Sequence, residues 1–76
     1  MPTLARLGHI KIQMFADDHA PAHFHVRTPN SKAVIRLADL RILRGRLTSS
    51  EERAVMAWAR ANSEVLHDGW IALRRR

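Results

Sequence analysis

Hydrophobic and polar residues alternate along the first half of the chain, as they do in strands that bury one face of a sheet. Three runs show this two-residue period, at residues 9–15, 23–27 and 32–37. A shorter apolar run at 40–43 is the candidate for a fourth strand that forms a hairpin with the third. The pattern therefore predicts three to four strands, joined by segments rich in the turn-forming residues Asp, Pro, Asn and Ser.

The second half of the chain changes to the spacing of a helix. Two overlapping capping boxes mark a helix start near residue 50: Thr48 with Glu51, and Ser49 with Glu52. Apolar residues then recur every three or four positions, and Gly69 supplies a stop. We therefore expect one long helix over residues 50–67, followed by a short helical turn around residues 70–73.

Strands followed by a helix predict an α+β fold, with an antiparallel sheet covered on one face by the long helix. We expect a single domain over residues 1–73 and a basic tail at 74–76. The alternation predicts which residues form the core: Ile10, Ile12, Met14, Phe24, Val26, Ala33, Ile35 and Leu37 on the sheet, and Val55, Trp58, Ala59, Val65 and Leu66 on the helix. The uncovered face is then cationic and carries His9, Lys11, Gln13, His23, His25, Arg27, Lys32 and Arg36.

Length and composition limit the classes of function. A chain of 76 residues suffices for one compact domain, which excludes an enzyme with separate cofactor and substrate lobes. The formal net charge of +6 indicates acidic partners. Cysteine is absent, so disulfides, thiolate zinc sites and a cysteine nucleophile are excluded. The sequence has no run long enough to span a membrane and no signal-peptide core, so we expect a cytoplasmic protein without membrane contact.

The most unusual segment is DDHAPAHFHV at residues 17–26, which combines two carboxylates with three imidazoles. On a strand, His23 and His25 project from the same side, roughly 7 Å apart. His19 precedes them in a loop, next to Asp17 and Asp18. We therefore expect the imidazoles and one acid to converge on the uncovered face.

One chemistry that fits this segment is a metal site. The ligands would be His19, His23, His25 and Asp17, and the ion would be zinc, nickel or another divalent metal. An open coordination position would hold a water whose pKa the ion lowers, which makes a hydrolytic nucleophile.

The other chemistry is acid–base catalysis without a metal. His19, His23 and His25 would act with Asp18 as general base and general acid on a phosphodiester. RNA is the natural substrate of such a site, because its 2′-hydroxyl is an internal nucleophile. The phosphate would be held by three cations of the uncovered face: Lys11, Arg27 and Arg36.

A non-enzymatic role is the alternative to both chemistries. The histidine strand would then contact a protein, a metal or DNA as part of a binding or regulatory module. The uncovered face offers no aromatic residue for stacking bases, and Trp70 is the better candidate for a partner anchor. Exposed edge strands also allow a homodimer joined edge to edge.

The DDHAPAHFHV segment resembles a family of short bacterial proteins known as domain of unknown function family four-one-six-zero. The likeness spans nearly the whole chain, including the opening MPTLARLGHIKIQMF, the strand at 32–35, a turn at 45–47, and the tryptophans Trp58 and Trp70. The family usually carries Asn at the position of Ala20 and Pro at that of Ala22, whereas every ionisable residue of the motif is retained here.

The resemblance implies a bacterial cytoplasmic protein that is often encoded beside a second small domain, in an arrangement similar to toxin–antitoxin modules. It assigns no role to the recurring polar residues of the motif. Together with the basic charge, it leads us to expect the basic member of such a pair, which acts on RNA or another phosphate-bearing target and is held inactive by a cognate antitoxin-like protein.

Overall fold

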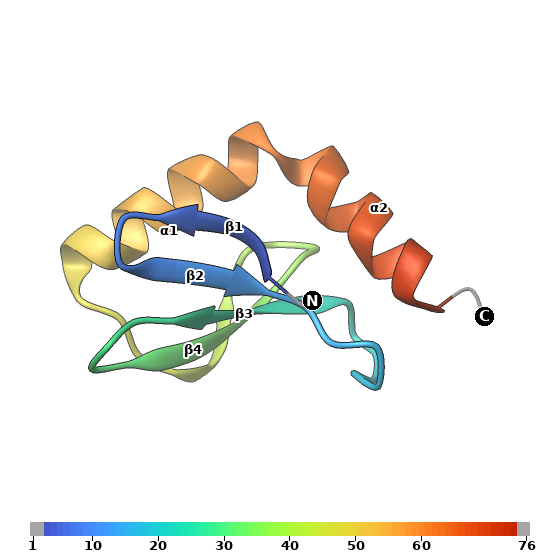
Figure 1. Ribbon diagram of the computed structural model, residues 1–76, viewed down its shortest axis with the longest axis horizontal. Helices are drawn as coiled ribbons and strands as arrows, with labels where there is room; N and C mark the ends of the chain where they lie inside the picture. The colour runs from blue at the N-terminus through green and yellow to red at the C-terminus, as the bar shows by residue number, and fades with distance from the viewer. Residues whose placement is uncertain (1–2, 75–76) are drawn as a thin grey trace.

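The computed structural model describes residues 3–74 and confirms the α+β class (Figure 1). Five strands are followed by two helices: β1 (Thr3–Leu7), β2 (Ile10–Gln13), β3 (His23–Arg27), β4 (Lys32–Arg36), β5 (Ile42–Gly45), α1 (Ser49–Ala61) and α2 (Ser63–Arg74). Each strand pairs antiparallel with the next along the chain, in the order β1-β2-β3-β4-β5. Figure 1 shows both helices on one side of the sheet. Within residues 3–74, neither helix has the length and apolar character needed to cross a membrane.

The predicted number of strands, three to four, is wrong because it omits β1. This strand consists of Thr, Leu, Ala, Arg and Leu, and most of these residue types favour helices over strands. It pairs with β2, and Leu7 lies opposite Ile10 across a turn at Gly8 and His9. Gly8 has a φ of +62°, which glycine adopts at little cost. A glycine in a two-residue turn between two apolar residues is the local signal for this hairpin.

The last strand is shifted relative to its prediction at residues 40–43. Leu40 adopts a positive φ of 57° in the connection, and β5 begins only at Ile42. The strand ends at Gly45, which has a φ of +78° and lies against β4. A Cβ atom at Gly45 would overlap the carbonyl oxygen of Lys32, so the pairing of β4 with β5 requires glycine there.

The single long helix of the prediction is divided in two at Asn62. The start is as expected, because Thr48 and Glu51 form the capping box. Asn62 then donates its side-chain amide to the carbonyl oxygen of Trp58 at 2.9 Å and closes α1. The expected stop at Gly69 is wrong, because α2 continues through this residue.

The predicted basic tail begins inside α2. Arg74 is the last residue of this helix, whereas residues 75 and 76 lie outside the described part of the chain. The helix therefore includes all of the segment at 70–73 for which only a short helical turn is predicted.

The core lies between the sheet and the two helices and is close to the prediction. All eight expected sheet residues are buried, and so are Val55, Ala59 and Leu66 of the helices. Trp58 is half-buried and packs against this cluster. Val65 does not belong to the core, because 48% of it is exposed. The break at Asn62 changes the helical phase, so the continuous periodicity assumed for one helix places Val65 incorrectly.

Candidate functional site

Four basic residues form a row across the sheet face that the helices leave uncovered. Arg6 on β1 lies opposite Lys11 on β2, Lys11 lies opposite Arg27 on β3, and Arg27 lies opposite Lys32 on β4. Directly opposed residues share a face of the sheet, so the four side chains project to the same side. All four residues are exposed. We call Arg6, Lys11, Arg27 and Lys32 the cationic row.

The cationic row has no carboxylate partner among residues 3–74. The ion pairs of this part of the chain are His9–Glu51, His23–Asp18, His25–Asp18 and Arg36–Asp39. Like charges directly opposite each other destabilise a sheet. The row is therefore a feature that costs stability in the free protein and suits an anionic ligand.

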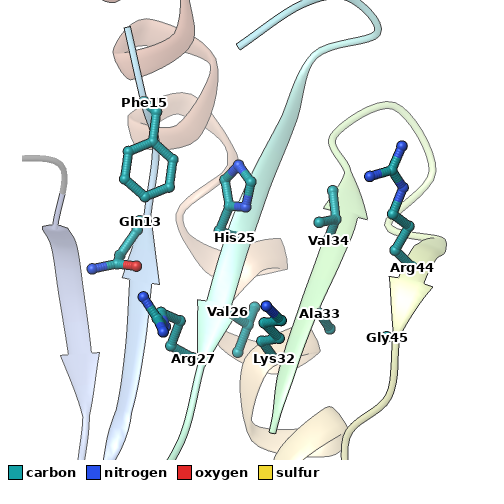
Figure 2. Close-up of a pocket in the computed structure, with 10 residues that line it drawn as sticks. All are labelled: Gln13, Phe15, His25, Val26, Arg27, Lys32, Ala33, Val34, Arg44 and Gly45. Carbon is teal, nitrogen blue, oxygen red and sulfur yellow. The ribbon is translucent and has the colours of Figure 1, made fainter. Parts of the chain in front are cut away.

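A shallow cavity of about 510 Å³ lies beside the row on the same face (Figure 2). Arg27 and Lys32 of the row line it, together with Arg44 of β5 and His25 of β3. Gln13 also lines the cavity, and its buried Oε1 atom has no hydrogen-bond partner among the described residues. The cavity thus combines three cations and one imidazole.

A carboxylate and a second imidazole converge on His25, which lines this cavity. Asp18 Oδ2 lies 3.1 Å from His25 Nε2 and 3.5 Å from His23 Nε2. Both histidines belong to β3, two residues apart, whereas Asp18 comes from the loop that joins β2 to β3. The backbone N–H of Phe15 donates to Asp18 Oδ2 at 3.2 Å and fixes the carboxylate from the other side. We call Asp18, His23 and His25 the His/Asp cluster.

Aromatic side chains hold both imidazoles of the cluster in place. The ring centroids are 4.7 Å apart for Phe15 and His25, 5.2 Å for His25 and His23, and 5.2 Å for His23 and Trp70. The guanidinium carbon of Arg74 lies 3.7 Å from the ring centroid of Trp70, so a cation–π contact ends this series of ring contacts. The cluster is consequently packed between the end of β2 and the last turns of α2.

Arg74 also anchors the loop that carries Asp18. Its Nη2 donates to the carbonyl oxygen of Asp18 at 2.6 Å, and its Nη1 donates to the carbonyl oxygen of Ala16 at 3.3 Å. Neither Arg74 nor the packing role of Trp70 can be identified from the sequence. Arg74 and Asp18 are 56 residues apart in the chain, and no local sequence pattern connects them.

The hydrogen bonds determine where the protons of the neutral imidazoles lie. His23 Nδ1 is 2.7 Å from the carbonyl oxygen of Pro21, which can only accept, so Nδ1 carries a proton. Neutral His23 then presents an unprotonated Nε2 to Asp18. His25 Nε2 lies against the same carboxylate and donates to it, which leaves His25 Nδ1 as the acceptor in the neutral ring.

The comparison with known proteins places the chain in a family. The sequence pattern of Domain of unknown function (DUF4160) matches residues 10–71. The chain belongs to this family. No curated protein and no solved structure matches the chain. The DUF4160 match includes the whole His/Asp cluster and Trp70, whereas β1 and Arg74 lie outside the matched residues.

The predicted ligands and catalytic residues of this DUF4160 domain are only partly brought together. Asp18, His23 and His25 form the cluster, but His19 and Asp17 are exposed in the loop and are not members of it. A metal site built from His19, His23, His25 and Asp17 therefore does not match the arrangement. The loop turns Asp18 toward the two histidines of β3, and the N–H of Phe15 holds its carboxylate there, whereas His19 and Asp17 remain exposed.

The predicted phosphate ligands are also divided. Lys11 and Arg27 belong to the cationic row, whereas Arg36 pairs with Asp39 through two hydrogen bonds of 2.9 and 2.7 Å. These hydrogen bonds from Arg36 lower the pKa of Asp39 to about 2 and raise the pKa of Arg36. Arg36 already has a carboxylate partner and is less available to a phosphate than the residues of the row.

Proposed function

We propose that this protein binds RNA on the cationic row and cleaves it at the adjacent His/Asp cluster. One observation carries the proposal: His25, which Asp18 orients, lines the same cavity as Arg27 and Lys32 of the row. A phosphate bound by these cations would be next to an imidazole that is positioned to move a proton.

Binding would depend mainly on phosphate contacts. The row presents four exposed cations to a polyanion and no carboxylate of residues 3–74 pairs with them. Such contacts position a nucleic acid without reading its sequence, and they weaken as salt increases.

Cleavage would use the 2′-hydroxyl of the RNA. His25 Nδ1 accepts the 2′-hydroxyl proton, the 2′-oxygen attacks the adjacent phosphorus, and the bond from phosphorus to the 5′-oxygen breaks. The leaving 5′-oxygen takes a proton from water, and the imidazolium of His25 returns its proton to the hydroxide so formed. Asp18 stabilises that imidazolium through Nε2–H, as a carboxylate does in a catalytic dyad. Arg27, Lys32 and Arg44 stabilise the charge that develops on the phosphate.

The proposed cellular setting is a toxin–antitoxin-like pair in the bacterial cytoplasm. The excess of basic over acidic residues supports an acidic partner protein, which would inhibit the chain by covering the cationic row. Homodimers are a further proposed assembly, because β1 and β5 are the edge strands of the sheet and offer unpaired backbone groups.

A non-enzymatic binding module is the second candidate, and one observation favours it. Both nitrogens of His23 face protein acceptors, Pro21 O and Asp18 Oδ2, so His25 alone is left to exchange a proton with a substrate. In this case the chain would bind RNA on the row without cleaving it.

The two candidates are separated by incubating the protein with a labelled RNA oligonucleotide and with the same sequence carrying 2′-O-methyl groups. We expect both to bind and only the unmodified RNA to be cleaved. His25→Ala should abolish cleavage and retain binding. Binding of both RNAs without cleavage of either would contradict the enzymatic role and favour the binding module. Failure to bind either RNA at low salt would contradict the proposed function altogether.

A further inference from the structure

We propose that Asp18, His23 and His25 together bind one divalent metal ion of the zinc class. Each residue offers one ligand atom, and these atoms all lie within 4.8 Å of one another. This ligand set differs from the one that the sequence suggests, because Asp18 replaces Asp17 and His19 is not part of it. The proposal concerns the cluster itself and does not depend on RNA as the substrate.

The two separations that involve Asp18 are close to those of a small tetrahedral ion, and the ligand atoms of His23 and His25 lie within 4.8 Å of each other. Zinc lies about 2.0–2.1 Å from imidazole nitrogen and about 2.0–2.2 Å from carboxylate oxygen, which places tetrahedral ligand atoms roughly 3.3–3.5 Å apart. Asp18 Oδ2 is 3.1 Å from His25 Nε2 and 3.5 Å from His23 Nε2. Only small side-chain movements would therefore bring these ligands to their bonding positions.

The hydrogen bond of His23 has the form that metal-ligating histidines usually show. A histidine that ligates a metal typically donates its other ring N–H to a backbone carbonyl or a carboxylate. His23 Nδ1 makes this contact with Pro21 O at 2.7 Å. Its neutral ring then directs the Nε2 lone pair at the carboxylate of Asp18, so that two acceptors face each other. A positive charge between them, supplied by a metal ion or by a second proton on His23, removes this repulsion.

The surroundings of the cluster hold the ligands in advance. Phe15 packs on His25 and Trp70 packs on His23, so both rings have limited freedom to rotate. Arg74 and the N–H of Phe15 fix the loop and the carboxylate of Asp18. These contacts reduce the entropy that three separate side chains would lose on binding an ion.

The cluster would leave one coordination position for water, as catalytic zinc sites do. Side-chain exposure is 13% for His23 and 14% for Asp18 but 26% for His25, which lines the cavity. An ion would therefore be reached from the cavity. Binding of the ion to His25 Nε2 would place the ring proton on Nδ1, so the metal-bound cluster and the metal-free acid–base site are alternative states of the same three residues.

The test is a titration of the metal-depleted full chain with zinc, followed by isothermal calorimetry, and a parallel titration with cobalt followed by visible absorption. We expect one ion per chain and the absorption of tetrahedral cobalt. His23→Ala and Asp18→Asn should each weaken zinc binding by at least about 100-fold. Asp18→Asn keeps the shape of the side chain, so it remains informative if His23→Ala folds poorly.

Matched controls are His19→Ala and Asp17→Asn, which alter neighbouring residues of the same loop and should leave zinc affinity unchanged. The proposal is overturned if the wild-type chain binds no zinc, or if binding survives both Asp18→Asn and His23→Ala, which would indicate ions on exposed histidines. It is also overturned if His19→Ala removes binding. RNA is absent from these titrations, so their outcome is independent of whether the chain binds or cleaves RNA.

Discussion

Arg74 donates a hydrogen bond of 2.6 Å to the backbone carbonyl oxygen of Asp18. This contact joins the end of α2 to the loop that supplies the only carboxylate of the His/Asp cluster. Arg74 also covers Trp70, which in turn packs on His23. The last turn of the second helix thus determines the geometry of a site whose ligands lie more than 45 residues earlier in the chain.

The first prediction concerns this anchor. Arg74→Ala should lower the free energy of unfolding by about 1.5–3 kcal/mol, the range for a hydrogen bond to a charged group. It should also reduce RNA cleavage about tenfold with little effect on RNA affinity, because the loop that positions Asp18 loses its support. Urea denaturation and single-turnover cleavage measure the two effects. A variant with normal cleavage would show that the anchor does not position the site.

The second prediction concerns the cationic row. Arg27→Gln should reduce the slope of log Kobs against log salt by about 0.7, the value for one phosphate contact with a single strand. The substitution should also stabilise the fold by roughly 0.2–1 kcal/mol, because Arg27 lies between Lys11 and Lys32. Arg53→Gln on α1 is the matched control, since this exposed residue belongs to the layer on the other face of the sheet. Equal salt slopes for the two variants would exclude the row as the binding surface.

The third prediction concerns glycine at the end of β5. Gly45→Ala should destabilise the protein by about 2–4 kcal/mol, since the new Cβ overlaps Lys32 O and the residue has a positive φ. Gly8→Ala provides the comparison, because its φ is also positive but nothing lies within 4 Å of the added Cβ. It should cost only about 1–2 kcal/mol, the strain of the left-handed backbone. Chemical denaturation of both variants separates the effect of the Cβ overlap from that of the positive φ. Equal losses in the free energy of unfolding for Gly45→Ala and Gly8→Ala would argue against the overlap.

The fourth prediction concerns acid stability. The hydrogen bond from Arg36 lowers the pKa of Asp39 from 3.8 to about 2 in the folded chain. A lowered folded-state pKa means that the pair stabilises the fold above pH 3.8, and that this contribution is lost as the pH falls through about 2. The Asp39→Asn variant should therefore be less stable than wild type near neutral pH. At a pH near 2 the two proteins should be equally stable. Urea denaturation of both proteins between neutral pH and pH about 2 tests this prediction. A stability difference between wild type and Asp39→Asn that does not change with pH would contradict it.

Several features of the fold follow from local patterns in the sequence. Alternation identifies the strands around His25 and Ile35 and their buried faces, because each side of a strand has one environment. The capping box at Thr48 marks the start of α1, because it depends on residues three positions apart. In contrast, β1 has weak strand propensity, and the break at Asn62 interrupts a periodicity that continues in the sequence.

The candidate site could be predicted only in outline. The spacing of His23 and His25 on one strand places both imidazoles together, but the choice of Asp18 over Asp17 depends on how the loop turns. The N–H of Phe15 and the guanidinium of Arg74 decide this, and the second of these contacts comes from the far end of the chain. The composition of the loop contains no information about a partner so distant in sequence.

The central claim is that His25, oriented by Asp18, promotes attack of the RNA 2′-hydroxyl on a phosphate held beside the cationic row. Mass spectrometry of the RNA fragments tests it most directly, because this reaction leaves a 2′,3′-cyclic phosphate on one fragment and a 5′-hydroxyl on the other. We expect these ends with the wild-type chain and intact RNA with His25→Ala. Fragments with other ends, or the same fragments from His25→Ala, would contradict the claim.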